Sequence, residues 1–468
     1  MSRFGARAQL VVLALLAAYF LVWPLWRLPF PIEIAQTEGW NAYHADTAFS
    51  AGLYPAPDSL VVANYPPLSF LFVGALQYLS GFDALYIGRV LSLIATLGTG
   101  ALIWRVVMQL GGGRVAGAIA GIWFVATMTR SFHHYIGANE PQIVAHLVMT
   151  AALLWFLARE QREATLEGPV LLMVLAGFYK HNIAAVPLTA FVWLAARRGL
   201  RDWRGLWRPF VIGGIAAVLG LGVCMAIWPN FIANMLTPRT YSFLRALGGL
   251  GRLQFILPAL ILWAIYAWSA RATPVARFTA LYVAISLLLY VVQWSGAEVL
   301  DSAQFDLVIA AAVGLGVAYE YAGIGAFARR YGAETARATM VAILLVRLLA
   351  TTHLESLLIL TDGAYRAQIR AHAETARADV EAVAALPGPV ACDFKVTCRF
   401  AGKPFSYDDF RAEMIVALSR QQATHDPTGQ TKAVTEADLM RQHGLTHYKG
   451  HPESGIVSLQ RVLFGRVE

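Results

Sequence analysis

Residues 10–28 read LVVLALLAAYFLVWPLWRL, with one arginine and no other charged side chain. A bilayer core offers no water to backbone N–H and C=O groups. An apolar run close to the ~20 residues of a standard span therefore predicts a helix that crosses a membrane. The preceding MSRFGARAQ has the basic start of a secretory signal peptide. No small-residue cleavage site follows, so we expect an uncleaved first span.

Similar runs recur along most of the chain. Of its 468 residues, 57% are hydrophobic and 14% charged, and mean hydropathy is +0.54, whereas soluble proteins carry about a quarter charged residues. Further apolar runs begin near Leu85, Val115, Pro141, Pro169, Ile183, Pro209, Leu253, Phe278, Phe305 and Thr339. The sequence therefore predicts an all-α polytopic membrane protein with about eleven transmembrane helices. The net charge of +8 does not indicate nucleic acid, since the arginines lie scattered at the ends of spans.

The short apolar segment 66–79 decides the topology. If it does not cross, the arginine-rich loops 105–114, 159–162, 197–204, 271–277 and 329–337 all face the cytoplasm, as the positive-inside rule requires. We therefore expect a multi-pass protein of a bacterial inner membrane with a cytoplasmic N-terminus. Segment 66–79 is then part of a long first outer loop, residues 31–84, and lies along or dips into the outer face. We expect residues 1–361 to form the transmembrane domain and 362–468 an extracytoplasmic module.

That C-terminal module is predicted to be a small α/β unit. Alanine and charge at helical spacing predict a helix over 362–387, and the break at Pro-Gly-Pro precedes a short strand at 389–392. Further helices are expected at 407–420 and 436–443, and a closing strand at 456–464. Cys392 and Cys398 lie close together, and the sequence leaves open whether they form a disulfide.

Unusual polar groups gather in the expected outer loops. Ionisable residues at membrane depth are costly, which makes such clusters candidate functional sites. Carboxylates supply acid–base or metal chemistry, and cations bind anionic groups such as phosphate. Each residue also has a simpler interpretation, as a solvated loop acid, an interfacial side chain or a helix N-terminal charge. The candidates are Glu38, Asp46, Tyr65, Asn139, Glu140, Lys180, His181, Arg245, Asp301 and Asp306.

This pattern resembles the GT-C superfamily of polyprenyl-phosphate-sugar-dependent glycosyltransferases, which includes protein mannosyltransferases and the aminoarabinose transferase of lipid A. The resemblance rests on Glu38 in TEGWNAYHADTA, on NYPPLSFLFVGAL followed by GRVLSL, on Glu140 in NEPQ, and on the outer C-terminal module. An uncharacterised bacterial branch with EGWNAY, NDPQ, KHN and FD elements is the most similar. That branch has aspartate where this chain has Glu140. These motifs are short and moderately specific.

The resemblance implies transfer of a sugar from a polyprenyl-phosphate donor to an extracytoplasmic glycan, lipid or protein acceptor, with inversion. Glu38 is then the candidate base, with Glu140 and Asp46 as further catalytic candidates. The donor phosphate would be held by Lys180, His181 and Arg245, and the prenyl chain would lie in a groove between spans. Membrane lipids are further expected partners. No soluble cofactor is expected, because the glycine runs do not fit a nucleotide site. A divalent metal at Glu38, Glu140 and Asp301 remains open.

Two other classes compete with this hypothesis. A transporter or lipid flippase would also need many spans with polar groups. However, the apolar runs show no two-fold repetition, and the polar residues crowd the outer ends of the spans. A scaffold protein would need no convergence of cations and carboxylates.

Overall fold

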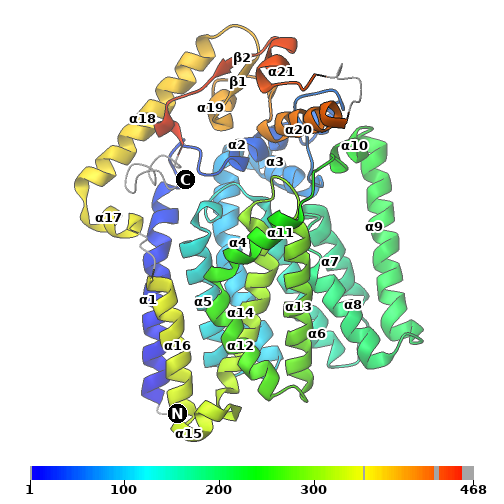
Figure 1. Ribbon diagram of the computed structural model, residues 1–468, viewed down its shortest axis with the longest axis vertical. Helices are drawn as coiled ribbons and strands as arrows, with labels where there is room; N and C mark the ends of the chain where they lie inside the picture. Colours follow the sequence, from blue (N-terminus) through cyan, green and yellow to red (C-terminus); the bar gives the residue numbers. More distant parts are fainter. Residues whose placement is uncertain (1–2, 351–353, 426–431, 456–468) are drawn as a thin grey trace.

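The computed structural model describes residues 3–350, 354–425 and 432–455, and it consists of a helix bundle with a smaller unit at one end (Figure 1). All eleven predicted runs are helical. They form α1 (Arg3–Arg27), α4 (Ala84–Gln109), α5 (Arg114–Ser131), α6 (Pro141–Glu160), α7 (Glu167–Tyr179), α8 (Ala185–Arg198), α9 (Arg208–Ile227), α12 (Leu257–Ser269), α13 (Pro274–Trp294), α14 (Phe305–Glu320) and α16 (Ala333–Leu349).

Fewer than these eleven helices have the length and composition of a membrane span. Among the described residues, six helices are long and apolar enough to cross a membrane, or up to seven if a bent pair counts as one span. The all-helical membrane fold is thus confirmed, and the number eleven stays a prediction. The N-terminus and the short α15 (Ala326–Tyr331) lie at the end of the bundle away from the smaller unit.

The centre of the bundle is α14, which is buried from Phe305 to Tyr319. Small residues let its neighbours approach closely, as is common between membrane helices. A Cβ at Gly121 of α5 would lie 2.3 Å from the carbonyl oxygen of Gly100 in α4, and one at Gly316 would lie 2.6 Å from Val107. These glycines fix the spacing of α4, α5 and α14.

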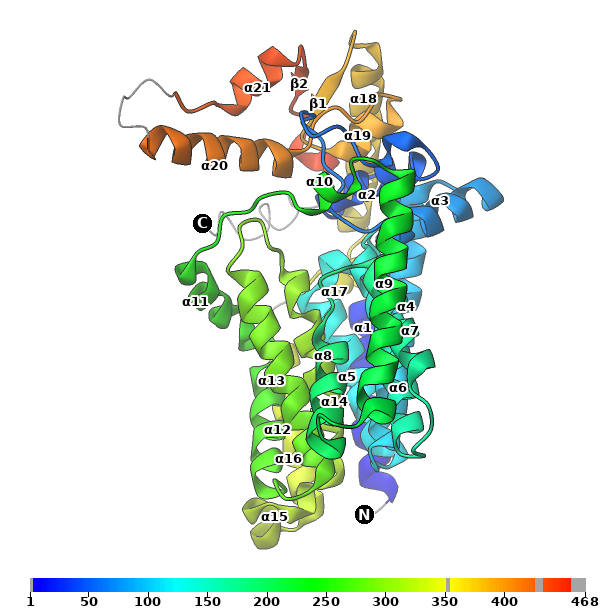
Figure 2. The ribbon, with the colours of Figure 1, turned by 90° about the vertical axis from the view of Figure 1, so that its right-hand side faces the viewer.

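Short helices cover the end of the bundle that carries the smaller unit, which we call the module end. They are α2 (Thr37–Asp46), α3 (Leu68–Ser80), α10 (Phe231–Met235) and α11 (Phe243–Arg252). Figure 2 shows α3 lying across this end and not along the bundle, as predicted for segment 66–79. It ends at Gly81, whose φ of 73° favours glycine.

The smaller unit, which we call the tail, follows α17 (Glu355–Thr361). It comprises α18 (Gly363–Ala385), β1 (Val390–Cys392), α19 (Lys395–Phe400), α20 (Asp409–His425), α21 (Glu436–Gln442) and β2 (Thr446–Tyr448). The two strands are parallel, with Val390 opposite Thr446. The predicted helices and first strand are present, whereas α19 and β2 were not predicted. The expected strand 456–464 lies outside the described residues. Cys392 and Cys398 form a disulfide.

Ion pairs and an aromatic contact hold the tail against the bundle. Arg399 of α19 donates to both oxygens of Asp46, at 2.6 and 2.8 Å, and to Asp83 at 2.9 Å. Tyr43 stacks on Phe405, with ring centroids 4.7 Å apart. Because these contacts join the first loop to the tail, any cavity at the module end has walls from both.

Candidate active site between the bundle and the tail

Two connected cavities, each of about 280 Å³, lie at the module end. The deep lobe reaches Glu140, Lys180 and His181, where α6 begins and α7 ends. The tail lobe lies between α2 and the tail. Both lobes share Asn64, Tyr65, Arg239, Glu298 and Leu300. The tail lobe is further lined by Gln36, Thr37, Trp40, Lys395, Asp408, Asp409, Phe410 and Glu413.

Lys180 supplies a buried cation to the deep lobe. It follows the last residue of α7, and its side chain is 5% exposed. Its Nζ lies 2.9 Å from the centroid of the Tyr65 ring and 3.9 Å from Oε1 of Glu140. A cation over an aromatic face is attracted by the ring quadrupole, and more so when desolvated. The geometry thus holds a positive charge against the cavity wall.

Glu140 occupies the N-cap of α6, ahead of Pro141. Its Oε1 accepts the Gln142 backbone N–H at 3.4 Å, and its Oε2 accepts the Thr37 hydroxyl at 2.9 Å. A carboxylate is favoured at a helix N-terminus, and proline suits the first helical position. The Asn-Glu-Pro-Gln sequence thus places an acid beside Lys180.

Glu38 lies next to Thr37 but faces the protein interior. Its Oε1 accepts from Arg89 Nε at 2.9 Å and from the Asn139 N–H at 2.8 Å. Its Oε2 accepts from Arg89 Nη2 and from the Ile34 N–H, both at 2.8 Å. The side chains of Glu38 and Arg89 are fully buried, and neither residue lines a lobe. This saturated geometry argues against the predicted general base at Glu38 and makes it an anchor.

Arg89 is the partner that sequence reasoning missed, although it lies in the GRVLSL element. Its Nη1 also donates to the carbonyls of Leu28 and Phe30, and Nη2 to that of Ile32. It therefore holds the chain that leaves α1. A charged residue inside an otherwise apolar span was the available signal, because such a residue normally has a buried partner.

The other predicted residues divide between the site and its surroundings. Tyr65 and His181 line the deep lobe, whereas Asn139 lies beside Glu38 and donates its N–H there. Asp46 joins Arg399 and serves docking. Asp306 is buried inside the bundle, 3.5 Å from His146 Nδ1. Asp301 pairs with Arg252 in a neighbouring cavity, and Arg245 is exposed and donates to Thr240. None of these last four residues lines either lobe.

Arg239 takes the place expected for Arg245. It lies on the shared wall, with its guanidinium carbon 4.8 Å from the centroid of the Phe410 ring in α20. Both arginines stand in the same loop sequence, so spacing alone did not distinguish them. The Ala297 carbonyl, which accepts from Arg239 Nη1 at 3.4 Å, and Phe410 of the docked tail together hold Arg239 at the cavity.

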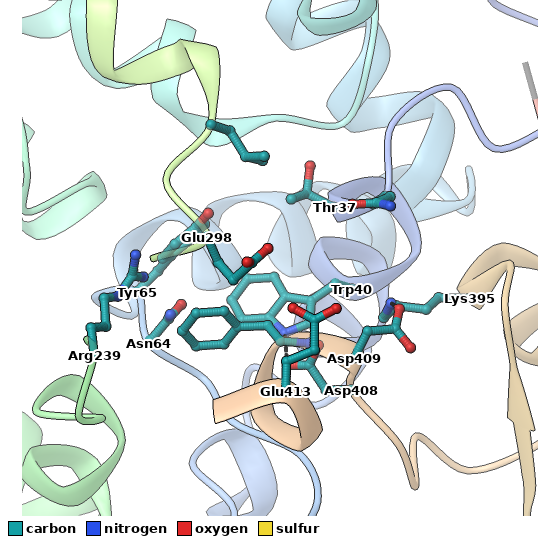
Figure 3. A pocket seen from close by; sticks show the side chains of 13 residues that line it. Thr37, Trp40, Asn64, Tyr65, Arg239, Glu298, Lys395, Asp408, Asp409 and Glu413 are labelled. Atoms are coloured by element: carbon teal, nitrogen blue, oxygen red, sulfur yellow. Dashed lines mark hydrogen bonds and ion pairs between the residues drawn. The ribbon is translucent and has the colours of Figure 1, made fainter. Parts of the chain in front are cut away.

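Two acids, Glu298 and Glu413, meet in the tail lobe (Figure 3). Glu298 has an unusual positive φ of 54°, a conformation that costs free energy for any residue except glycine. It hydrogen bonds to Glu413 of α20. Partial burial and the nearby Glu298 charge raise the pKa of Glu413 to about 7. The Glu413 carboxyl therefore exchanges its proton near neutral pH.

The remaining acids of the tail lobe are engaged. Asp408 accepts from Trp40 Nε1 at 3.0 Å and from the Phe410 N–H at 3.3 Å, the second of which caps the start of α20. Burial raises the pKa of Asp408 to about 6. Asp409 forms an ion pair with Lys395 at 2.5 Å. These contacts shape the lobe and join it to α2.

No group of three or more His, Cys, Asp or Glu side chains that could hold a metal ion occurs within the described parts of the chain. No protein-family model and no curated protein sequence matches the chain.

Solved structures are similar across nearly the whole chain. The crystal structure of ArnT from Cupriavidus metallidurans bound to undecaprenyl phosphate matches with a TM-score of 0.58 and 16% identity, over 94% of this chain and 91% of that one. The fold is ArnT-like. The apo state of that ArnT matches with a TM-score of 0.52 and 17% identity, over 98% of this chain and 89% of that chain. This similarity confirms the fold that the sequence resemblance implied.

Proposed function

We propose that this protein is a membrane glycosyltransferase that transfers a sugar from a polyprenyl-phosphate donor. The observation that carries the proposal is the two-lobed cavity, in which Lys180 and Arg239 stand across from carboxylates at the module end of an ArnT-like bundle. The similar ArnT structure is bound to undecaprenyl phosphate. A lipid-linked phosphate needs cations at the ends of membrane helices, and this cavity offers them.

The donor phosphate binds in the deep lobe in this proposal. Lys180 and Arg239 donate charge-assisted hydrogen bonds to its oxygens, and His181 lines the same wall. Glu140 orients Lys180 through their ion pair, and Thr37 fixes Glu140. Arg239 thereby replaces Arg245 in the predicted phosphate set.

The acceptor occupies the tail lobe, and Glu298 is the general base. Glu298 lies on the wall shared by both lobes, so it can face an acceptor hydroxyl opposite the leaving phosphate. Glu298 takes the hydroxyl proton as the acceptor oxygen bonds to the anomeric carbon. The bond from that carbon to the phosphate oxygen breaks, and polyprenyl phosphate leaves with its charge stabilised by Lys180 and Arg239. Direct displacement inverts the configuration.

The acceptor is a glycan, lipid or protein group. Trp40 and Phe410 offer aromatic surfaces to a sugar ring, and the acids of the lobe accept hydrogen bonds from hydroxyls. The tail thus binds acceptor without carrying the base, because Glu298 belongs to the loop after α13.

Orientation belongs to the same proposal. We assign residues 1–361 to a transmembrane catalytic domain of a bacterial inner membrane and 362–468 to an extracytoplasmic module, with a cytoplasmic N-terminus. The disulfide between Cys392 and Cys398 fits an oxidising compartment. Single cysteines at positions 58 and 410 should react with a membrane-impermeant thiol reagent in intact cells. Reaction at position 202 instead would invert the topology.

The activity is tested with the purified protein and radiolabelled polyprenyl-phosphate sugars, scoring the glycoside formed. Glu298→Gln should lower turnover by roughly 10²–10⁴-fold, the usual contribution of a general base, with donor affinity unchanged. Arg245→Ala is the matched control and should retain activity. Donor movement across vesicle membranes without glycoside formation would support the alternative, a transporter or lipid flippase, and overturn the proposal.

A further inference from the structure

A separate cavity of about 370 Å³ lies beside the two lobes, behind the loop 299–301. It borders the tail lobe at Gln36, Thr37 and Leu300. Its other walls come from Ile34, Ala35, His133, His134, Tyr135, Arg252, Trp294, Val299 and Asp301. The proposed transfer uses none of this second set.

Arg252 gives this cavity a reachable cation. Its side chain is 55% exposed, and its Nη1 lies 3.9 Å from Oδ1 of Asp301. That separation exceeds the ~2.7–2.9 Å of a charge-assisted hydrogen bond. Oδ1 of Asp301 is itself buried without a hydrogen-bond partner. The guanidinium also stands 6.0 Å from the centroid of Trp294. Arg252 is therefore held at the cavity mouth by weak contacts that an anion can replace.

Arg252 is the last residue of α11, and α11 has the form of a helix that lies on a membrane surface. The α11 segment is bent by 86° from α12, which runs along the bundle (Figure 2). Phe243 and Leu244 are 76% and 78% exposed, and Leu247 and Leu250 are also exposed. An amphipathic helix of this kind buries its apolar face at the boundary between headgroups and acyl chains.

The inner face of α11 is fixed to α13. Tyr290 donates to the Gly249 carbonyl at 2.6 Å, and a Cβ at Gly249 would lie 2.5 Å from the Trp294 ring. This packing leaves the apolar residues on the outer face and sets Arg252 at the cavity. One short helix thus joins an exposed apolar surface to a cationic pocket.

We infer that this cavity binds the anionic headgroup of a membrane lipid. The lipid phosphate replaces Asp301 as the close partner of Arg252, and the acyl chains cover the outer face of α11. Charge complementarity selects an anionic headgroup over a zwitterionic one, and the exposed apolar face selects a lipid over a free anion.

The test measures lipid binding to the full-length protein in detergent by native mass spectrometry. Phosphatidylglycerol, phosphatidylcholine and inorganic phosphate are titrated separately, and no sugar transfer is scored, so the result is independent of the proposed enzymatic activity. Phosphatidylglycerol should bind at least about tenfold tighter than phosphatidylcholine, and Arg252→Ala should remove about tenfold of its affinity. Arg245→Ala, on the same helix but outside the cavity, should change the affinity less than twofold.

Asp301→Asn provides a second variant that keeps the cation in place. Removing the competing carboxylate charge should tighten phosphatidylglycerol binding severalfold. Equal losses in Arg252→Ala and Arg245→Ala would reveal diffuse attraction to a basic helix and overturn the inference. Inorganic phosphate binding as tightly as phosphatidylglycerol would identify a soluble anion and overturn it too. An unchanged affinity for phosphatidylglycerol in both Arg252→Ala and Asp301→Asn would also overturn the inference.

Discussion

Two neighbouring ion pairs, Glu38–Arg89 and Glu140–Lys180, lie at the module end. Hydrogen bonds near their acids join the first and second loops. Glu38 accepts the N–H of Asn139, while the next residue back, Thr37, donates to Glu140. Glu38 then meets Arg89 in a bidentate contact at 2.8 and 2.9 Å, whereas Glu140 lies 3.9 Å from Lys180. Both pairs are buried, but only the second faces a cavity.

The difference lies in how completely each charge is satisfied. A buried pair with all its hydrogen bonds made holds the fold, and removing one partner leaves an uncompensated charge. A buried pair at 3.9 Å still has donors to offer an anionic ligand. An acid in a motif shared with an enzyme family can therefore be assigned a catalytic role only once its hydrogen-bond and ion-pair partners are known.

The comparison predicts its largest effect at Glu38. Glu38→Gln should lower the free energy of unfolding by about 3–5 kcal/mol, because Arg89 keeps its buried charge without a carboxylate. Thermal unfolding in detergent measures this loss. Glu140→Gln is the comparison variant, and it should lose less stability, because its partner Lys180 is 3.9 Å away and faces a cavity. A Glu38→Gln protein of wild-type stability that makes no glycoside would restore Glu38 as the base.

A smaller effect is expected at the open pair. Lys180→Ala should weaken donor binding by roughly ten- to a hundredfold, because a hydrogen bond to a charged group contributes about 1.5–3 kcal/mol. Equilibrium binding of a polyprenyl-phosphate sugar measures this directly. Arg239→Ala should weaken binding in the same range. If both variants bind donor like the wild type, the deep lobe is not the phosphate site.

The docked tail supplies one wall of the tail lobe, so weakening its attachment distinguishes the acceptor side of the cavity from the donor side. Arg399→Gln removes the ion pairs to Asp46 and Asp83, which are partly exposed and joined by other contacts. We expect the acceptor KM to rise roughly threefold to tenfold, with donor affinity unchanged. Arg441→Gln, on the exposed face of α21, is the control. A parallel loss of donor affinity would mean that the tail also forms the donor site.

The smallest expected effect concerns pH. Below its raised pKa of about 7, the Glu413 carboxyl is protonated and donates a hydrogen bond to Glu298. Turnover should therefore rise as the pH passes about 7, because Glu298 then loses this donor and gains a like charge beside it. Glu413→Gln removes the titrating carboxyl, so the change in turnover near pH 7 should disappear. An unshifted pH–rate profile would separate this pair from the reaction.

The sequence by itself determined the helices of the bundle. Apolar runs such as 10–28 and 85–109 need backbone hydrogen bonds within the segment, so their helical state is a local property. The distribution of arginines between the loops likewise predicted that segment 66–79 does not cross with the bundle, and α3 lies across its end. In the tail, the helical spacing of alanine, apolar and charged residues located α18, α20 and α21, because this spacing is also a local property of the sequence.

Only the tertiary structure decided which polar side chains meet. Glu38 and Arg89 are 51 residues apart, and Arg239 contacts the Ala297 carbonyl and the Phe410 ring, both distant along the chain. Adjacent residues of α2 face different surroundings, since Thr37 lines the tail lobe and Glu38 is buried against Arg89, so a motif cannot tell which of them reaches the cavity. Hydrophobic periodicity places an element against the membrane. The partner of a charge depends on packing between distant segments, and this packing pairs Glu38 with Arg89 and brings Arg239 to the cavity wall.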